Sequence, residues 1–167
     1  MEIQIRESDV RAAATRGMDD FIMLFHDRIL QAVGGQLDAV AMQQLNGDQI
    51  TLLAYVILRD EVMTGGFIQL IHNGYGGFIF LNPFAKAVRL WGLGELAKLI
   101  YKGRKLYEEH AGAIEQECSD EEFMALYEQY PDFDDLDDGF VTQEEGFTEA
   151  IAHYVDEHLD KFVQIVN

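Results

Sequence analysis

Carboxylate side chains recur at helical spacing in the last third of the chain, and rows of carboxylates can bind basic proteins or metal ions. Glu145 and Glu149 are four residues apart, and so are Asp156 and Asp160. On an α-helix such pairs share a face and lie about 6 Å apart along the axis. One strand of duplex DNA carries a phosphate about every 3.4 Å. Each pair therefore approximates the spacing of every second phosphate, which suits a basic protein surface.

The negative charge is confined to one part of the chain. The sequence holds 30 acidic and 12 basic side chains, a formal net charge of −18. Residues 1–106 hold 11 of each, whereas residues 107–167 hold 19 acidic side chains and one base, Lys161. The acidic segment is also rich in aromatic and aliphatic residues, so we expect it to fold. A folded surface with this charge repels DNA and anionic membranes and attracts basic partners.

Length and composition indicate one domain in a reducing compartment. With 167 residues, 49% of them hydrophobic, the chain is long enough for one core. We expect a single domain, with residues 1–106 as a charge-neutral helical scaffold and residues 107–167 as an acidic helical face. Cys118 is alone, and neither a secretory signal nor a membrane-spanning segment is recognisable. The sequence therefore predicts a cytoplasmic protein.

Hydrophobic residues repeat with the helical period almost throughout, which predicts an all-α fold. Asp48 is the expected N-cap of a long apolar helix that Gly65-Gly66 ends. The segment 73–83 is expected to be a loop, and within it residues 78–81 are the one weak strand candidate. The expected helices cover residues 19–33, 37–45, 48–63, 67–72, 84–93, 95–111, 119–130 and 142–166.

The acidic segment is predicted to form a helix-loop-helix. Ser119-x-x-Glu122 and Thr142-x-x-Glu145 are capping boxes that begin its two helices, with an Asp-rich loop over residues 132–139. Apolar residues gather on one side of each helix and leave the carboxylates on the other. The predicted partner-binding residues are Glu121, Glu128, Asp132, Asp134, Asp135, Asp137, Asp138, Glu145, Glu149, Asp156 and Asp160.

Calcium binding is a second interpretation of these acids. An EF-hand-like loop fits residues 134–145, with Asp134 at its first position and Glu145 at its last. Leu136 occupies the third position and supplies no side-chain oxygen. A loop without that ligand would bind calcium weakly at best, so no metal site is predicted.

Catalysis is not indicated by any local motif. The glycines of residues 74–77 lack the Lys-Ser/Thr that follows a phosphate-binding loop. The carboxylates are too numerous and too exposed to be tuned acids and bases. The sequence therefore predicts a binding protein without a cofactor. An acidic scaffold that binds another protein through the Gly-rich segment 67–80 is an alternative from a different class.

The central segment carries a distinctive motif, Glu61-Val62-Met63-x-Gly65-Gly66-Phe67-x-Gln69, followed by Asn73-x-x-Gly76 and a helix over residues 87–97 that contains Gly92. This pattern resembles that of a bacterial family of DNA-mimic proteins typified by a neisserial member. The resemblance runs from about Asp48 to Val163 and includes the acidic tail.

The resemblance implies an all-helical protein without catalytic activity, whose carboxylates imitate the phosphates of duplex DNA. Such a protein would occupy the DNA-binding surface of a partner and relieve repression by competition. The implied partners are a dimeric helix-turn-helix repressor and the histone-like protein HU. A two-fold repressor dimer would be matched best by a homodimer of this chain.

Overall fold

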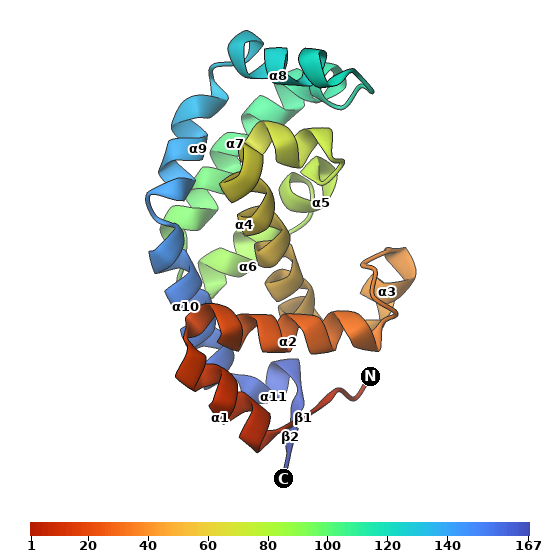
Figure 1. Ribbon diagram of the computed structural model, residues 1–167, viewed down its shortest axis with the longest axis vertical. Helices are drawn as coiled ribbons and strands as arrows, with labels where there is room; N and C mark the ends of the chain where they lie inside the picture. The colour runs from red at the N-terminus through yellow and green to blue at the C-terminus, as the bar shows by residue number, and fades with distance from the viewer. The chain divides into compact units, whose positions relative to one another are not determined.

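The fold is all-α, as the hydrophobic period predicts. A computed structural model describes all 167 residues, with eleven helices and one short two-stranded parallel sheet (Figure 1). Contacts divide the chain into two compact units: unit 1 comprises Met1–Val56 and Glu145–Asn167, and unit 2 comprises Ile57–Glu144. None of the helices combines the length and the apolar character that crossing a bilayer requires.

Unit 1 brings the two ends of the chain together. Strands β1 (Gln4–Arg6) and β2 (Gln164–Val166) pair in parallel, with Ile5 opposite Ile165. Sequence period predicts neither strand, because three residues are too short a run to show alternation. Its helices are α1 (Glu7–Arg16), α2 (Met18–Ala32), α3 (Ala39–Gln44), the first part of α4 (Gly47–His72), α10 (Glu144–Glu157) and α11 (Leu159–Phe162).

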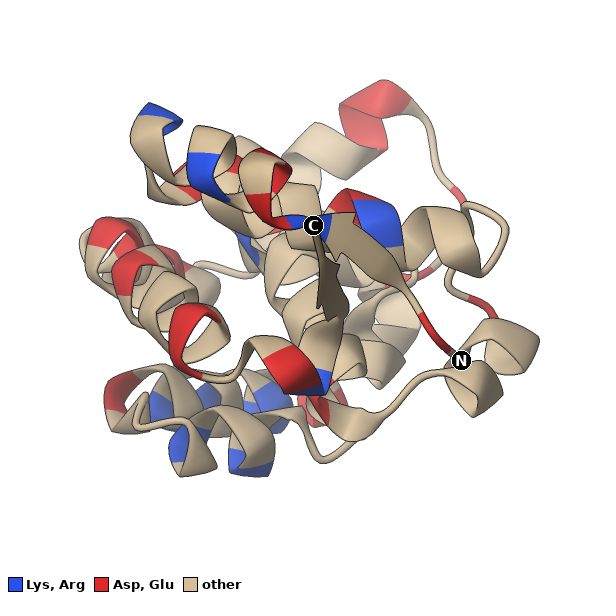
Figure 2. Cartoon of the chain, turned by 90° about the horizontal axis from the view of Figure 1, so that it is seen from below, with Lys and Arg blue, Asp and Glu red and all other residues tan.

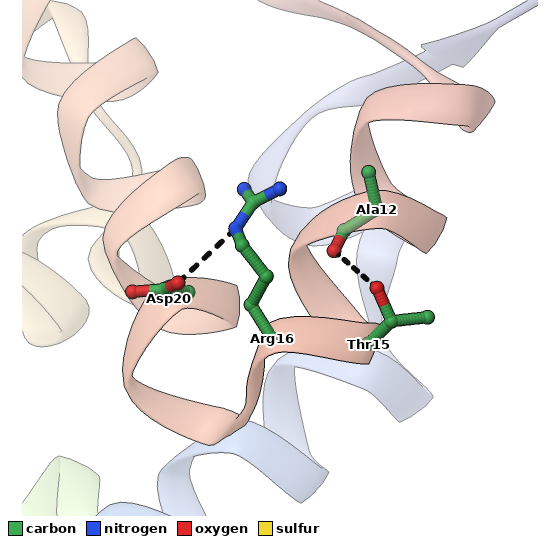
Figure 3. Close-up of polar contacts among 4 residues, drawn as sticks. All are labelled: Ala12, Thr15, Arg16 and Asp20. Atoms are coloured by element: carbon green, nitrogen blue, oxygen red, sulfur yellow. Dashed lines mark hydrogen bonds and ion pairs between the residues drawn. The ribbon is translucent and has the colours of Figure 1, made fainter.

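The corner between α1 and α2 is a tight turn at Gly17, whose φ of 120° favours glycine. Arg16 Nε bonds Asp20 Oδ2 at 3.1 Å across this corner, and the Thr15 hydroxyl donates to the Ala12 carbonyl at 2.7 Å (Figure 3). The Arg16–Asp20 pair thus joins the end of α1 to the first turn of α2, and the Thr15 bond lies within the last turn of α1.

Asn46, and not Asp48, caps the N-terminus of α4. The Asn46 Oδ1 accepts from the Gln49 backbone N–H at 2.8 Å, and the Gln49 Oε1 accepts from the Asn46 N–H at 3.0 Å. The same two side chains donate to the carbonyls of Lys161 and Phe162, each at 2.8 Å. The expected cap at Asp48 is therefore wrong, because Asn46 satisfies both the helix start and the chain near α11.

Unit 2 is a group of helices packed around α7 (Gly94–Ile114). Helix α7 contacts α5 (Gly76–Phe80), α6 (Phe84–Leu90) and α9 (Phe133–Val141). Gly103 permits the close approach, because a Cβ there would lie 2.6 Å from the Phe80 ring and 3.2 Å from Leu136 Cδ2. The remaining elements of unit 2 are the second part of α4 and α8 (Asp120–Gln129).

Two segments expected to be loops are helices. Residues 76–80 form α5, so the weak strand at 78–81 is also wrong. Phe133, Leu136 and Phe140 are buried in α9, which replaces the expected Asp-rich loop. Their spacing of three and four residues is helical, and burial of these side chains on the rest of unit 2 outweighs the poor helix propensity of Asp and Gly.

One of the two expected capping boxes is present. Ser119 Oγ accepts from the Glu122 N–H, and the Glu122 carboxylate accepts from the Ser119 N–H, both at 3.2 Å. The second box is absent: Thr142 has helical backbone angles (φ −69°, ψ −22°) at the end of α9, where its hydroxyl donates to the Asp138 carbonyl, and α10 begins only at Glu144. The last helix also stops at Glu157 instead of continuing to residue 166.

Candidate partner-binding surfaces

Helices α8, α9 and α10 contain many acids and no lysine or arginine. Both units are negative: unit 2 holds 17 acidic and 7 basic residues, and unit 1 holds 13 acidic and 5 basic residues. Figure 2 shows the acidic residues in red and the basic residues in blue. The charge that is segregated in the sequence is therefore carried by a folded surface in each unit.

In unit 2, α9 presents its aspartates on the side away from its buried residues. Phe133, Leu136 and Phe140 are buried, whereas the aspartates that flank them are exposed, with one exception. Asp134 and Asp138 are four residues apart, the spacing of a carboxylate row along one helix face. The exposed predicted residues of unit 2 are Glu121, Glu128, Asp132, Asp134, Asp135 and Asp138.

Asp137 is the exception, because its carboxylate is half-buried and engaged within unit 2. Its Oδ1 accepts from the Phe67 backbone N–H at 2.8 Å. Burial raises the pKa of Asp137 to about 6; the Phe67 bond opposes this shift, and the nearby Asp134 and Asp138 carboxylates add to it. A group placed in this way holds the fold, and it is poorly placed to meet a partner.

Two of the exposed aspartates face lysines across a cavity of about 400 Å³. Asp132 and Asp135 line one side, and Lys102 and Lys105 of α7 line the other. The lysines offset part of the negative potential there. The least compensated acids of α9 are therefore Asp134 and Asp138.

In unit 1, α10 carries the acidic row. Phe147, Thr148, Ile151 and Val155 are buried, and Glu145, Glu149 and Asp156 are exposed, within about 40° of one another on the helical wheel. His153 lies in the same row, with its Nε2 3.7 Å from Glu149 Oε1.

Asp160 does not continue this row on the same helix. The backbone leaves the helical region at His158, with φ −135° and ψ 40°, and Asp160 belongs to the short helix α11. The sequence predicts one helix that holds all four carboxylates. This prediction is wrong, because the helix breaks before Asp160. Asp160 remains exposed beside the end of α10.

A small groove beside the α10 row is not predicted from the sequence. It has a volume of about 200 Å³ and lies between the α1–α2 corner and α10. Ala14, Gly17 and Phe21 contribute apolar wall, and Glu149 and Asp156 stand at its edge. The segment 7–16 is short and polar, so its hydrophobic period does not predict α1 from the sequence alone.

The central motif forms the kink in α4. Gly66 has φ 74°, and the Tyr127 hydroxyl donates to the Gly65 carbonyl at 2.6 Å. The Glu61 carboxylate accepts from Gln69 at 2.9 Å and from Asn73 at 3.0 Å, and so ties together the helix on both sides of the kink. These motif residues build the kink in unit 2 and contact α8 through Tyr127 and α9 through Asp137.

The calcium interpretation is contradicted by the structure. An EF-hand loop must wrap its oxygens around the ion, but residues 134–141 are helical. Side chains along one helix point outward in different directions and cannot converge in that way. The structure holds no group of three or more His, Cys, Asp or Glu side chains arranged for a metal ion.

The central and acidic segments are similar to known proteins. A family model described as DMP19-like protein matches residues 43–158. The DNA mimic protein DMP19 of Neisseria meningitidis serogroup B (strain MC58) is 34% identical over 122 residues, which cover 72% of this chain and 74% of that protein. The family match includes all of α4 to α10 and excludes the α1–α2 corner.

Proposed function

The chain belongs to the DMP19-like protein family, and we propose that it is a DNA mimic. Its exposed carboxylates would take the place of duplex phosphates on the DNA-binding surface of a basic protein. DNA would then be excluded by competition. The proposed contacts are Glu121, Glu128, Asp132, Asp134, Asp135 and Asp138 of unit 2 and Glu145, Glu149, Asp156 and Asp160 of unit 1.

The absence of lysine and arginine from α8, α9 and α10 is the observation that carries this proposal. Natural surfaces intersperse both signs to limit self-repulsion. In three successive helices without a base, the carboxylates repel one another with no compensating cation. Binding of a basic partner would relieve this repulsion. The four-residue spacing of Asp134 with Asp138, and of Glu145 with Glu149, approximates alternate phosphates.

The proposed partners are a dimeric helix-turn-helix repressor and a histone-like protein such as HU. Both present basic surfaces built to meet rows of phosphate. Binding to the repressor would relieve repression, without catalysis by this chain. We propose that the protein acts where DNA is held, in the cytoplasm, and that it forms a homodimer to match a two-fold partner.

Competition against labelled DNA tests the proposal. A fluorescent operator duplex bound to such a repressor, or a random duplex bound to HU, would be titrated with the protein at about 50 mM salt. We expect the DNA anisotropy to fall to the value of free DNA, and the competition to weaken steeply as salt rises. If the DNA stays bound to both proteins at low salt, the chain is not a mimic for these classes.

The scaffold alternative predicts a different response to charge. Most apolar side chains of residues 67–80 are buried, Phe67 and Phe80 among them, so this segment offers little free apolar surface. Replacing Asp134, Asp135 and Asp138 with Asn would leave a scaffold interaction intact. Mimicry would be weakened by the same three substitutions.

A further inference from the structure

The groove between the α1–α2 corner and α10 in unit 1 joins apolar wall and acidic edge in one small site. The walls come from the corner, through Ala14 and Phe21, and from Ala152 of α10. Glu149 and Asp156 are seven residues apart on α10, so they stand about 10 Å apart along the helix axis at the edge of the groove. An apolar centre within a polar rim is the usual anatomy of a protein interface.

Both walls of the groove are held in place by contacts of unit 1. At the corner, the Arg16–Asp20 pair joins α1 to α2 (Figure 3), and Gly17 makes the turn between them with φ 120°. Helix α10 is anchored by the buried side chains of Ile151 and Val155. A site with rigid walls loses little conformational entropy when it is filled.

The volume and charge of the groove indicate which kind of group it can bind. About 200 Å³ is smaller than the sites that hold small-molecule ligands, which start near 300 Å³, and it suits a single side chain. The carboxylates of Glu149 and Asp156 require a cation, while the apolar walls require a hydrocarbon stem. The neighbouring base Arg16 is already paired with Asp20. His153 also lines the groove, with its Nε2 3.7 Å from Glu149 Oε1, and no lysine or arginine is among the lining residues.

Arginine meets both requirements better than lysine. Its guanidinium is planar and weakly hydrated, and its stem lies readily on apolar surface. We propose that this groove receives an arginine side chain of the basic partner protein, so that recognition combines phosphate-like charge with a pocket that duplex phosphates do not offer. This inference rests on the proposed function and adds a specificity site to it. The corner lies outside the segment matched by the family model.

Filling the groove without changing any charge tests the inference. Ala152→Leu and Ala14→Leu each add bulk to a different wall of the groove. As a control, Ala12→Leu adds the same bulk at an exposed position of α1 (Figure 3) that does not line the groove. The probes are fluorescein-labelled peptides of nine arginines or nine lysines, followed by anisotropy at several salt concentrations. Circular dichroism checks that each variant is folded.

We expect the arginine peptide to bind the wild-type protein more tightly than the lysine peptide. Each groove variant should lose about fivefold to tenfold in affinity for the arginine peptide, with an unchanged salt slope. Glu149→Gln with Asp156→Asn should lose affinity and have a shallower salt slope. If both groove variants bind like Ala12→Leu, or if the two peptides bind equally to the wild-type protein, the groove inference is wrong.

DNA displacement by the wild-type protein separates this failure from that of the proposed function. Displacement that survives in Ala152→Leu as well as in Ala12→Leu would leave mimicry standing and remove the groove. A wild-type protein that displaces no DNA would overturn mimicry, whatever the peptides show.

Discussion

The Asp137 carboxylate accepts a hydrogen bond from the Phe67 backbone N–H at 2.8 Å, seventy positions away in the sequence. Gly66, just before Phe67, has φ 74°, and a Cβ on it would lie 2.5 Å from Asp137 Oδ2. Asp137 therefore serves as the cap of the helix that resumes after the kink in α4. Through this bond, the Asp-rich helix α9 is held to the motif that forms the kink.

Two substitutions of Asp137 should distinguish the contribution of its hydrogen bond to stability from that of its charge. Asp137→Asn keeps an oxygen that can accept from Phe67 and removes a charge that burial disfavours. We expect its free energy of unfolding at pH 7.5 to equal or exceed that of the wild type, whereas Asp137→Ala should cost about 1–2 kcal/mol. Urea unfolding measures both. Equal destabilisation by the two substitutions would contradict this account.

The raised pKa of Asp137 gives stability a defined pH dependence. Burial raises this pKa from 3.8 to about 6, so the folded state binds the proton more tightly than the unfolded state. The stabilisation is complete below about pH 4 and is lost as pH rises through 6. Because the side chain is partly exposed, the difference should be only about 1–2 kcal/mol.

Comparing the wild type with Asp137→Asn isolates the contribution of the Asp137 carboxylate to the pH dependence of stability. Other carboxylates also repel one another less at acid pH, so the wild type alone does not isolate one group. The free energy of unfolding of the wild type minus that of Asp137→Asn should fall between pH 4 and pH 7. A flat difference would show that the pKa of Asp137 is ordinary.

The role of Asp137 shows where sequence reasoning stops. The hydrophobic period predicts α2, α8 and the break at Gly65-Gly66, because these depend on residues close in sequence. It also predicts that the partner-binding acids are exposed, which holds for all of them except Asp137, because they lie on the helix faces opposite the apolar residues. The bond from Phe67 depends on how α9 packs against the kink, and no local pattern contains that information.

The sequence predicts a loop where α9 forms, for a related reason. Five aspartates and one glycine within residues 132–139 have low helix propensity. Phe133, Leu136 and Phe140 are few, and their burial depends on α7, which lies far away in sequence. Tertiary packing therefore makes this segment helical and outweighs its low intrinsic helix propensity.

Two glycines of α7 should respond in opposite directions to alanine. A Cβ at Gly103 would meet the Phe80 ring at 2.6 Å, whereas a Cβ at Gly112 would meet nothing within 4 Å. Gly112→Ala should stabilise by up to about 1 kcal/mol, the gain in helix propensity. Gly103→Ala gains the same propensity but should lose about 1–3 kcal/mol to overpacking.

Thermal unfolding compares the two alanine variants directly. We expect the midpoint of Gly112→Ala to rise and that of Gly103→Ala to fall. A Gly103→Ala protein as stable as Gly112→Ala would mean that α5 and α7 are not in close contact.

Asn46 should stabilise unit 1 through two hydrogen bonds, one at the start of α4 and one to the chain near α11. Asn46→Ala removes the acceptor for the Gln49 N–H and the donor to the Lys161 carbonyl, and should cost about 1–2 kcal/mol. Asn46→Asp keeps the acceptor and loses only the donor, so it should cost less. Chemical unfolding distinguishes them, and equal costs would assign the whole effect to the bond with Lys161.

The position of the acids, and not only their number, should determine competition with DNA. Glu145→Gln, Glu149→Gln and Asp156→Asn remove three exposed charges from α10. As a control with the same change in net charge, Glu2→Gln, Asp27→Asn and Asp60→Asn remove three exposed charges outside the acidic segment. If mimicry depends on the α10 row, the first triple variant should need about tenfold more protein to displace DNA from its partner.

The control triple should displace DNA nearly as well as the wild type, because its three charges lie outside the α10 row. Measuring both variants at several salt concentrations also counts the contacts, since each lost ion pair lowers the slope. Equal losses in the two triples would show that net charge alone attracts the partner, and the α10 row would then have no special role.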